Sequence, residues 1–364
     1  MMNRREVLFS IGGGVVASMF GVPVSGSLKA EGFGDGESPG DRTKLGIDDF
    51  SYNIRSRAEK AGYTPRLTGD PLTFLKYCHS IGAGGLQCAI GNRDEAYTKE
   101  LRSYVEDNDL FLEDSVRLGG KVDLGRFEAG VASVKAAGAR AIRGYCGGRR
   151  YEQFDNRQQF DEFADRSWKA IESAAPIVDK YRIPLAIENH KDWLIPHMLK
   201  MLKQIDSEYV GVCIDTGNSF ALLEDPVDVV KAYAPWAHAV HLKDMAVCEC
   251  EDGFLLADVV LGEGTLDLPK IVEIIRKARP GMKFSVEMST RNPLKVPCFD
   301  EKYWATLGDV PGENLARAMR YVRAHASDKD DLPDIDNLSV DEQVKLEDEN
   351  VRKCLRYAAE HLNL

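Results

Sequence analysis

Four short apolar stretches that end in polar residues constrain the fold of this chain more than any other feature. Each has the length and composition of a buried β-strand and turns polar at its last residues. The polar residues at these ends are Glu188, Asp215, His241 and Glu287. The first three are 27 and 26 residues apart, which is about one strand–helix unit, and the fourth follows after 46 residues. Four similar strand ends therefore predict one shared polar site.

The alternation of side chains along a strand predicts where these residues point. Residues i and i+2 share a face of a strand, so an inward Glu188 places Ile187 on the outer face and leaves His190 on the inner side. The same rule places Lys243 on the inner face together with His241. In all four strands the apolar side chains then face surrounding helices, and the polar ones face a common centre.

The rest of the chain alternates strand-like and helix-like segments, as is typical of a parallel sheet. Asp70 followed by Pro71, for example, is a helix start signal. We expect strands at 45–50, 85–89, 110–115, 139–143, 184–189, 210–215, 238–243 and 283–288. We expect helices at 70–81, 93–107, 123–137, 157–181, 193–206, 225–235, 267–278 and 312–326. Eight strand–helix units predict the α/β class and a (β/α)8 TIM barrel over residues 44–326.

The first 30 residues are typical of a targeting segment. Arg4 and Arg5 precede a weakly apolar, glycine-rich stretch at 9–20, and this pattern resembles a twin-arginine export signal. We therefore expect an exported, periplasmic protein, with a linker rich in Gly, Ser and acidic residues at 31–43. The alternative is an uncleaved tail.

The last part of the chain, residues 327–364, is expected to form an acidic linker and a C-terminal helix added to the barrel. Ser339 and Glu342 have the spacing of a capping box, which starts a helix that runs to about residue 361. We expect this helix to pack against the outside of the barrel. The alternative is a contact between two copies in a homo-oligomer.

Charge and cysteine usage exclude several classes of protein. The formal net charge of −11 disfavours a nucleic-acid partner, because non-specific binding needs basic contacts to phosphate. No segment after the N-terminus is long and apolar enough to span a membrane, so we expect no span in the mature chain. The eight cysteines are dispersed and predict no disulfide framework. Cys248 and Cys250 lack a second Cys/His pair at zinc-site spacing, and we expect them in a loop.

Three carboxylates and one imidazole on neighbouring strand ends predict a divalent metal site. The catalytic residues of a TIM barrel lie at the C-terminal ends of its strands. These ligands suit one Mn²⁺ ion as the first choice, with Mg²⁺, Co²⁺ or Zn²⁺ as alternatives. Such an ion can hold two neighbouring sugar oxygens and stabilise the enediolate that forms when the carbon beside a carbonyl loses a proton. Two carboxylates on opposite sides of the substrate would then serve as base and acid.

Five motifs lie at or near the expected strand ends. They are Ile187-Glu-Asn-His190, Cys213-Ile-Asp-Thr-Gly-Asn218, Val240-His-Leu-Lys-Asp244, Leu261-Gly-Glu-Gly264 and Val286-Glu-Met288. Together they resemble the xylose-isomerase-like TIM-barrel superfamily, the group of sugar phosphate isomerases, epimerases and AP endonucleases of family 2, over roughly residues 44–326. This resemblance implies that Glu188, Asp215, His241 and Glu287 bind the metal. It also implies that Glu188 and Glu287 move the protons.

The chain departs from the ketose epimerases of this superfamily at two positions. Asn218 stands where they often have a His three residues after the Asp ligand, and Gln87 stands where many relatives carry an acid on the second strand. An Asn can still donate a hydrogen bond to a sugar hydroxyl. These departures count against a simple epimerase of free ketoses.

Four further side chains are expected to contact the substrate, namely His190, Asn218, Lys243 and Arg143. For His190 the alternative is a hydrogen-bonded position in the core. For Lys243 it is a salt bridge to a ligand carboxylate, and for Arg143 it is exposure at the surface.

The sequence therefore predicts a metal-dependent isomerase or epimerase of a small sugar or keto-sugar, acting through an enediolate. A metal-dependent lyase or dehydratase on a 3-keto-glycoside or inosose is the alternative, since loss of the same proton can expel a leaving group. A non-catalytic sugar-binding barrel and a DNA-repair endonuclease are further alternatives. The related nucleases hold three zinc ions with more histidines, whereas this chain has seven in all.

Overall fold

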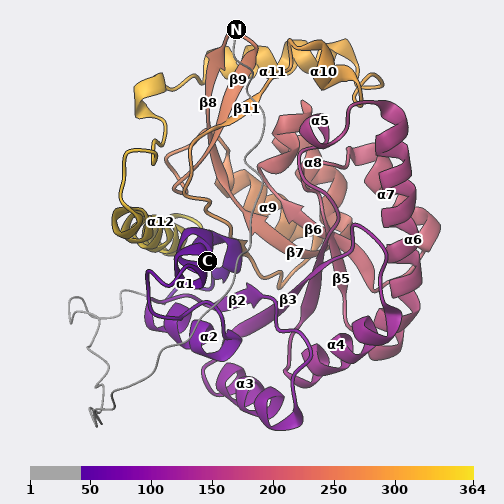
Figure 1. Cartoon of the computed structure of the whole chain (residues 1–364), viewed down its shortest axis with the longest axis vertical. Coiled ribbons are helices and arrows are strands. Elements are labelled where there is room, and N and C mark those ends of the chain that lie inside the picture. The colour runs from indigo at the N-terminus through magenta and orange to yellow at the C-terminus, as the bar shows by residue number, and fades with distance from the viewer. Residues whose placement is uncertain (1–41) are drawn as a thin grey trace, which may run out of the picture. The chain divides into compact units, whose positions relative to one another are not determined.

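The computed structural model describes residues 42–364, in which eight parallel strands close into a barrel (Figure 1). Each strand pairs with its neighbour in the order β1 (Gly46–Asp48), β10 (Ser285–Val286), β7 (Ala237–Leu242), β6 (Val210–Asp215), β5 (Leu185–Glu188), β4 (Ala141–Tyr145), β3 (Phe111–Arg117) and β2 (Gly85–Cys88). The predicted TIM barrel is confirmed. The expected signal at 1–30 and nearly all of the expected linker at 31–43 lie outside the described residues.

Helices cover the outside of the barrel and begin where the sequence places cap residues. Asp70 accepts a hydrogen bond from the Thr73 N–H at 2.9 Å and so caps the first predicted helix. The helices that follow the strands are α2 (Pro71–Ser80), α3 (Glu95–Asp107), α4 (Leu124–Ala136), α6 (Arg157–Tyr181), α7 (Ile195–Ile205), α8 (Pro226–Tyr233), α9 (Leu268–Ala278) and α11 (Gly312–Ala324). Shorter helical segments lie between these elements, namely η1 (Asp49–Tyr52), α1 (Asn53–Lys60), α5 (Arg150–Gln153), η2 (Asn218–Leu222), η3 (Ala234–Trp236) and α10 (Glu301–Trp304).

A small antiparallel sheet forms from a hairpin inserted between β7 and α9, where the sequence suggested a loop, and from a short strand that follows β10. It consists of β8 (Asp244–Cys250), β9 (Gly253–Val259) and β11 (Leu294–Val296), and it lies beside α11 (Figure 1). The expectation that Cys248 and Cys250 lie in a loop is wrong, because both belong to β8. Asp252-Gly253 lies between two segments of strand length, and an Asp-Gly pair in that position is a hairpin signal.

The expected C-terminal helix is present as α12 (Val340–His361), and the capping box of Ser339 and Glu342 starts it. This helix packs against α1 and η1. The short helix η4 (Lys329–Asp331) precedes it. Among the described residues, no helix is long and apolar enough to cross a membrane.

The core confirms the predicted direction of the side chains. Ile187, Ile214 and Val240 belong to the large apolar cluster between strands and helices. A separate, fully buried cluster contains only Ala186, Cys213 and Ala239. Each of these three residues lies two positions before Glu188, Asp215 or His241, so it shares the inner face with that polar residue. The C-terminal end of the barrel is therefore polar inside and apolar outside.

Candidate metal centre

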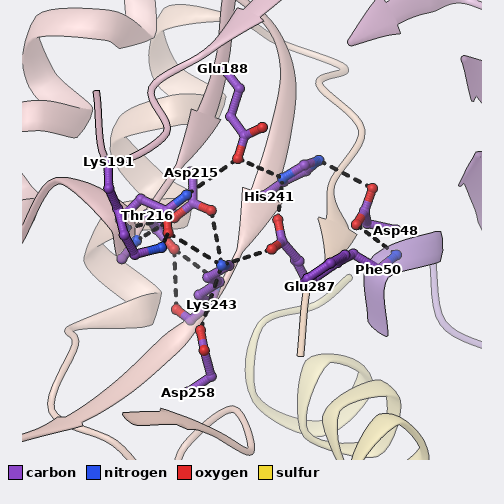
Figure 2. Close-up of polar contacts among 12 residues, drawn as sticks. Asp48, Phe50, Glu188, Lys191, Asp215, Thr216, His241, Lys243, Asp258 and Glu287 are labelled. Atoms are coloured by element: carbon purple, nitrogen blue, oxygen red, sulfur yellow. Dashed lines mark hydrogen bonds and ion pairs between the residues drawn. The ribbon is translucent and has the colours of Figure 1, made fainter. Parts of the chain in front are cut away.

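Glu188, Asp215, His241 and Glu287 converge at the C-terminal ends of four neighbouring barrel strands (Figure 2). One potential ligand atom from each lies within 4.8 Å of the others. All four side chains are buried. Glu188 and Asp215 are the last residues of β5 and β6, His241 lies in β7, and Glu287 directly follows β10. The structure thus brings together the four residues that the sequence singled out.

Within residues 42–364, Asp215 Oδ2, His241 Nδ1 and Glu287 Oε2 make no well-aligned hydrogen bond and instead lie close to one another and to Lys243 Nζ. Buried polar atoms normally have well-made hydrogen bonds, so this group of donor atoms around one point indicates a shared ligand. Carboxylate oxygens with one imidazole nitrogen form a donor set that suits Mn²⁺ or Mg²⁺, and also Zn²⁺. The residues present therefore fit a divalent cation.

The orientation of His241 is determined by a chain of side chains on β2 and β3. Its Nε2 lies 2.7 Å from Gln87 Oε1, and Gln87 Nε2 donates to Glu113 Oε2 at 2.8 Å. Because Glu113 can only accept, the amide oxygen of Gln87 must face the imidazole. His241 therefore carries a proton on Nε2 and directs Nδ1 toward the site, where Glu287 Oε2 lies 2.7 Å away.

Acidic neighbours favour the doubly protonated form of His241. Burial alone would lower its pKa, but the neighbouring Cys213 and Asp48 raise it well above the ordinary value of 6.5. In that form the second proton is on Nδ1, which lies 2.7 Å from Glu287 Oε2. A cation bound to Nδ1 displaces this proton, so metal binding to this group is coupled to proton release.

Glu188 is held by side chains on both of its oxygens. Arg143 Nε donates to Oε2 at 2.8 Å, and Asn218 Nδ2 donates to Oε1 at 3.2 Å. Burial raises the pKa of Glu188, but Arg143, His190 and His241 together outweigh this effect, and the net shift is downward. Arg143, which was expected to contact the substrate, is partly buried and pairs with a ligand carboxylate instead of lying free at the surface.

Lys243 forms the salt bridge that was considered for it. Its Nζ lies 2.9 Å from Glu287 Oε1, 3.2 Å from Asp215 Oδ2 and 3.5 Å from Asp258 Oδ1. Burial raises the pKa of Glu287, but Lys243 and His241 bring it well below the ordinary value. Glu287 is therefore an ionised carboxylate with one oxygen on the ammonium and the other facing the shared centre.

Backbone groups and Asn189 fix Asp215 in position. Its Oδ1 accepts the N–H groups of Gly217 and Asn218 at 2.9 and 2.8 Å, which leaves Oδ2 for the centre. The Asn189 side chain accepts the Asp215 N–H at 2.8 Å and donates to the Asp215 carbonyl at 2.9 Å. Asn189 therefore links the ends of β5 and β6.

The structure adds Lys191, Asp258 and Arg291 to the site. Lys191 follows β5 and hydrogen-bonds to Asn218 Oδ1. Asp258 comes from β9 and pairs with Arg291 at 2.6 Å. A sequence signal existed for Asp258, because a hairpin at 244–259 would return the chain to the barrel mouth. His190, expected to contact the substrate, is partly exposed, and its buried Nδ1 has no hydrogen-bond partner among residues 42–364.

The loop between β9 and α9 is shaped around a further carboxylate, Asp244 at the start of β8. Asp244 accepts N–H groups from Met245 at 2.9 Å, Gly262 at 2.9 Å, Gly264 at 3.1 Å and Leu266 at 3.0 Å. A Cβ on Gly264 would lie 2.2 Å from Asp244 Oδ1, so only glycine fits there. Gly262 has a φ of +87°, which also favours glycine, so both glycines of this motif have a structural reason.

The protein is thus a TIM barrel with a candidate metal centre, formed by carboxylates and an imidazole at the C-terminal ends of its strands. Residues 75–325 match the family model described as xylose isomerase-like TIM barrel, and the chain belongs to this family. The resemblance inferred from the motifs is confirmed.

A stretch of 114 residues is 31% identical to 3-oxo-isoapionate decarboxylase of Pectobacterium atrosepticum. This alignment covers 31% of this chain and 42% of that relative, so the chain spans less than half of its length.

Two solved structures of similar fold are a D-psicose 3-epimerase, at 16% identity and a TM-score of 0.51, and a 3-keto-D-glucoside 4-epimerase from E. coli, at 11% identity and the same TM-score. Both alignments cover 78% of this chain, with 97% and 99% of the respective structures. A xylose isomerase-like barrel from Mycobacterium smegmatis in complex with magnesium is 13% identical with a TM-score of 0.51, over 78% of this chain and 97% of that one. At identities this low, the comparisons show only that the fold is shared.

Proposed function

We propose that this protein is a metal-dependent enzyme, with Mn²⁺ as the first candidate ion, that isomerises or epimerises a small sugar or keto-sugar. It acts by removing a proton from the carbon next to a carbonyl. The observation that carries this proposal is the convergence of Glu188, Asp215, His241 and Glu287, whose potential ligand atoms lie within 4.8 Å of one another at one buried point. Relatives of the same fold that are epimerases of a ketose and of a keto-glucoside support it.

These four residues would hold the ion, which when bound stabilises negative charge on substrate oxygens. Glu188 and Glu287 are the carboxylates that we assign to proton transfer. Each has one oxygen fixed by a cation, Arg143 or Lys243, while the other faces the centre. Both carboxylates are ionised, and either can accept a proton from a carbon held between them.

The fate of the proton then decides the product. Return of a proton from the opposite carboxylate to the same carbon inverts its configuration, which is an epimerisation. Return to the neighbouring carbon moves the carbonyl, which is an isomerisation. We also propose an unphosphorylated substrate, because the expected export would separate the protein from cytoplasmic sugar phosphates.

A lyase acting on a 3-keto-glycoside, an inosose or a related 3-oxo compound is the second candidate. The identity with 3-oxo-isoapionate decarboxylase over 114 residues favours it. Loss of CO₂ or of a leaving group near a carbonyl requires the same stabilisation of negative charge on the carbonyl oxygen as loss of a proton.

Proton NMR in D₂O, with Mn²⁺ supplied in catalytic amounts, tests the proposal on a panel of ketoses and 3-keto-glycosides. Deuterium at the carbon beside the carbonyl together with a new stereoisomer identifies an epimerase, and a shifted carbonyl identifies an isomerase. Loss of the aglycone or of CO₂ identifies a lyase. Absence of exchange and of products across the panel would contradict the proposal.

The variant Glu287→Gln tests the role of this carboxylate in turnover. We expect turnover to fall by about 100-fold or more, because an amide cannot accept the proton. The matched control is Glu273→Gln on the exposed side of α9, which should keep wild-type turnover. Unchanged turnover in the Glu287 variant, with its circular dichroism intact, would rule out the assigned proton transfer.

A further inference from the structure

Lys191 is a buried cation at the candidate metal centre without a carboxylate partner. Its side chain is 3% exposed. Its Nζ hydrogen-bonds to Asn218 Oδ1, and among residues 42–364 no carboxylate oxygen lies within 4.0 Å of it. Lys243, Arg143 and Arg291 in the same site each pair with one or more carboxylates.

An uncompensated charge is costly at this depth. Moving an ammonium group out of water costs several kcal/mol unless a partner of opposite charge compensates it. The Asn218 amide oxygen, which also accepts from Lys243 Nζ at 3.4 Å, supplies only a partial negative charge. An ammonium group has three donors, so Lys191 has two left for a ligand.

The loop that carries Lys191 is fixed on both sides. The Lys191 carbonyl accepts the Arg150 N–H at 2.9 Å, and the Asp192 carboxylate accepts the Gly147 N–H at 2.8 Å. The next residue, Trp193, is fully buried and stacks on Phe163 with ring centroids 5.8 Å apart. Lys191 is thus held in place before any ligand arrives, and such preorganisation favours binding.

Figure 2 shows Lys191 directed toward Lys243 and Asp215, on the side of the site away from Asp48. Within the described residues, this polar network contains the carboxylates Asp48, Glu188, Asp215, Asp258 and Glu287. It contains the cations Arg143, Lys191, Lys243 and Arg291. Within residues 42–364, Lys191 is the cation of this network that has no carboxylate within 4.0 Å, and an anionic substrate would supply that partner.

We propose that Lys191 binds a carboxylate of the substrate, so that the natural substrate is a sugar acid or keto acid rather than a neutral sugar. This inference rests on the proposed function, because it places the carboxylate beside the same centre. Lys191 would donate to the carboxylate from its two remaining donors, while Asn218 holds the third.

Calorimetric titration with pairs of aldonates and alditols of three to six carbons tests the inference, since each pair differs only in the carboxylate. We expect the Mn²⁺-loaded wild type to bind at least one aldonate about tenfold or more tightly than its alditol, which is typical of a charge-assisted hydrogen bond. Lys191→Gln should lose this preference and keep its Mn²⁺ affinity. Lys203→Gln, which removes an exposed lysine from α7 of the same strand–helix unit, should keep the wild-type preference.

Two results would overturn the inference. The first is a wild type that binds no aldonate more tightly than its alditol. The second is a preference that persists in Lys191→Gln, which would place the carboxylate on the metal ion instead. Titration of the same samples with Mn²⁺ measures metal binding and so tests the proposed function separately. If the wild type bound no Mn²⁺, the proposed function would fail, while the aldonate preference of the metal-free protein would still decide the role of Lys191.

Discussion

Replacing Gln87 by leucine tests whether the β2 and β3 side chains prepare His241 for a metal ion. Leucine has a similar size but cannot accept the His241 Nε2 proton, for which Gln87 Oε1 now lies at 2.7 Å. The next carboxylate oxygen, Asp48 Oδ2, lies 3.6 Å from Nε2, beyond the range of a good hydrogen bond. The imidazole would therefore lose the partner that fixes its tautomer and its ring orientation.

The expected loss follows from the burial of this pair. Leaving a buried donor unpaired costs about 1–3 kcal/mol. The metal-bound form bears this cost most, because it requires Nδ1 to face the ion with the proton on Nε2. We therefore expect the affinity for Mn²⁺ to fall about 10- to 100-fold, which corresponds to roughly 1.4–2.7 kcal/mol and agrees with other residues that orient metal ligands.

Isothermal titration of Mn²⁺ into the metal-free protein measures this change directly. The matched control is Gln158→Leu on the exposed face of α6, which should leave Mn²⁺ affinity unchanged. Unfolding by urea, followed by circular dichroism, establishes that the Gln87 variant is folded. A folded variant whose Mn²⁺ affinity stays within about twofold of wild type would refute the reasoning, since that difference is less than about 0.5 kcal/mol.

Two further predictions concern stability. Burial raises the pKa of Glu224 from 4.5 to about 8, although it accepts the Ile195 N–H at the start of α7. As the pH rises, Glu224 therefore loses its proton at a lower pH in the unfolded chain than in the folded protein. The free energy of unfolding should fall as the pH rises from about 5 to 8, by an amount on the order of a few kcal/mol. Glu224→Gln should remove this part of the pH dependence in urea unfolding at pH 5 and 9, and an unchanged slope would contradict the assignment. Glu347 of α12 accepts the N–H groups of Ile54 and Arg55 at 2.7 and 2.9 Å. Glu347→Ala should therefore lower the free energy of unfolding by about 2–4 kcal/mol at pH 8, whereas the exposed control Glu349→Ala should lower it by less than about 0.5 kcal/mol. Equal losses in the two variants would show that these hydrogen bonds contribute little.

The barrel and its four central residues could be predicted because both depend on local periodicity. Apolar runs of strand length define the eight strands, and the two-residue alternation along each strand decides which side chains face inward. Ala186 and Glu188 illustrate this rule, since both point into the barrel while Ile187 between them packs outward. Strand limits were less exact, as β10 spans only Ser285–Val286 within the expected 283–288.

The inserted sheet shows where this reasoning failed. The spacing of Cys248 and Cys250 resembles that of a metal-binding pair, and the prediction of a loop considered only this pattern. The hairpin signal at Asp252-Gly253 indicates two paired strands, which is what β8 and β9 form. This error concealed Asp258, because only the pairing of Met245 with Asp258 across β8 and β9 brings that carboxylate back to Lys243. An irregular loop would have left its position undefined.

The sequence by itself determined the fold, the identity of the four converging residues and the strand ends on which they lie. Strand periodicity and cap residues act over a few positions, so they can be identified without knowing the rest of the molecule. Only the tertiary structure decided which charges are compensated, for example that Arg143 pairs with Glu188 while Lys191 has no carboxylate partner among the described residues. Ion pairs form within about 4 Å, and their partners here come from segments tens of residues apart, so no local pattern can identify them.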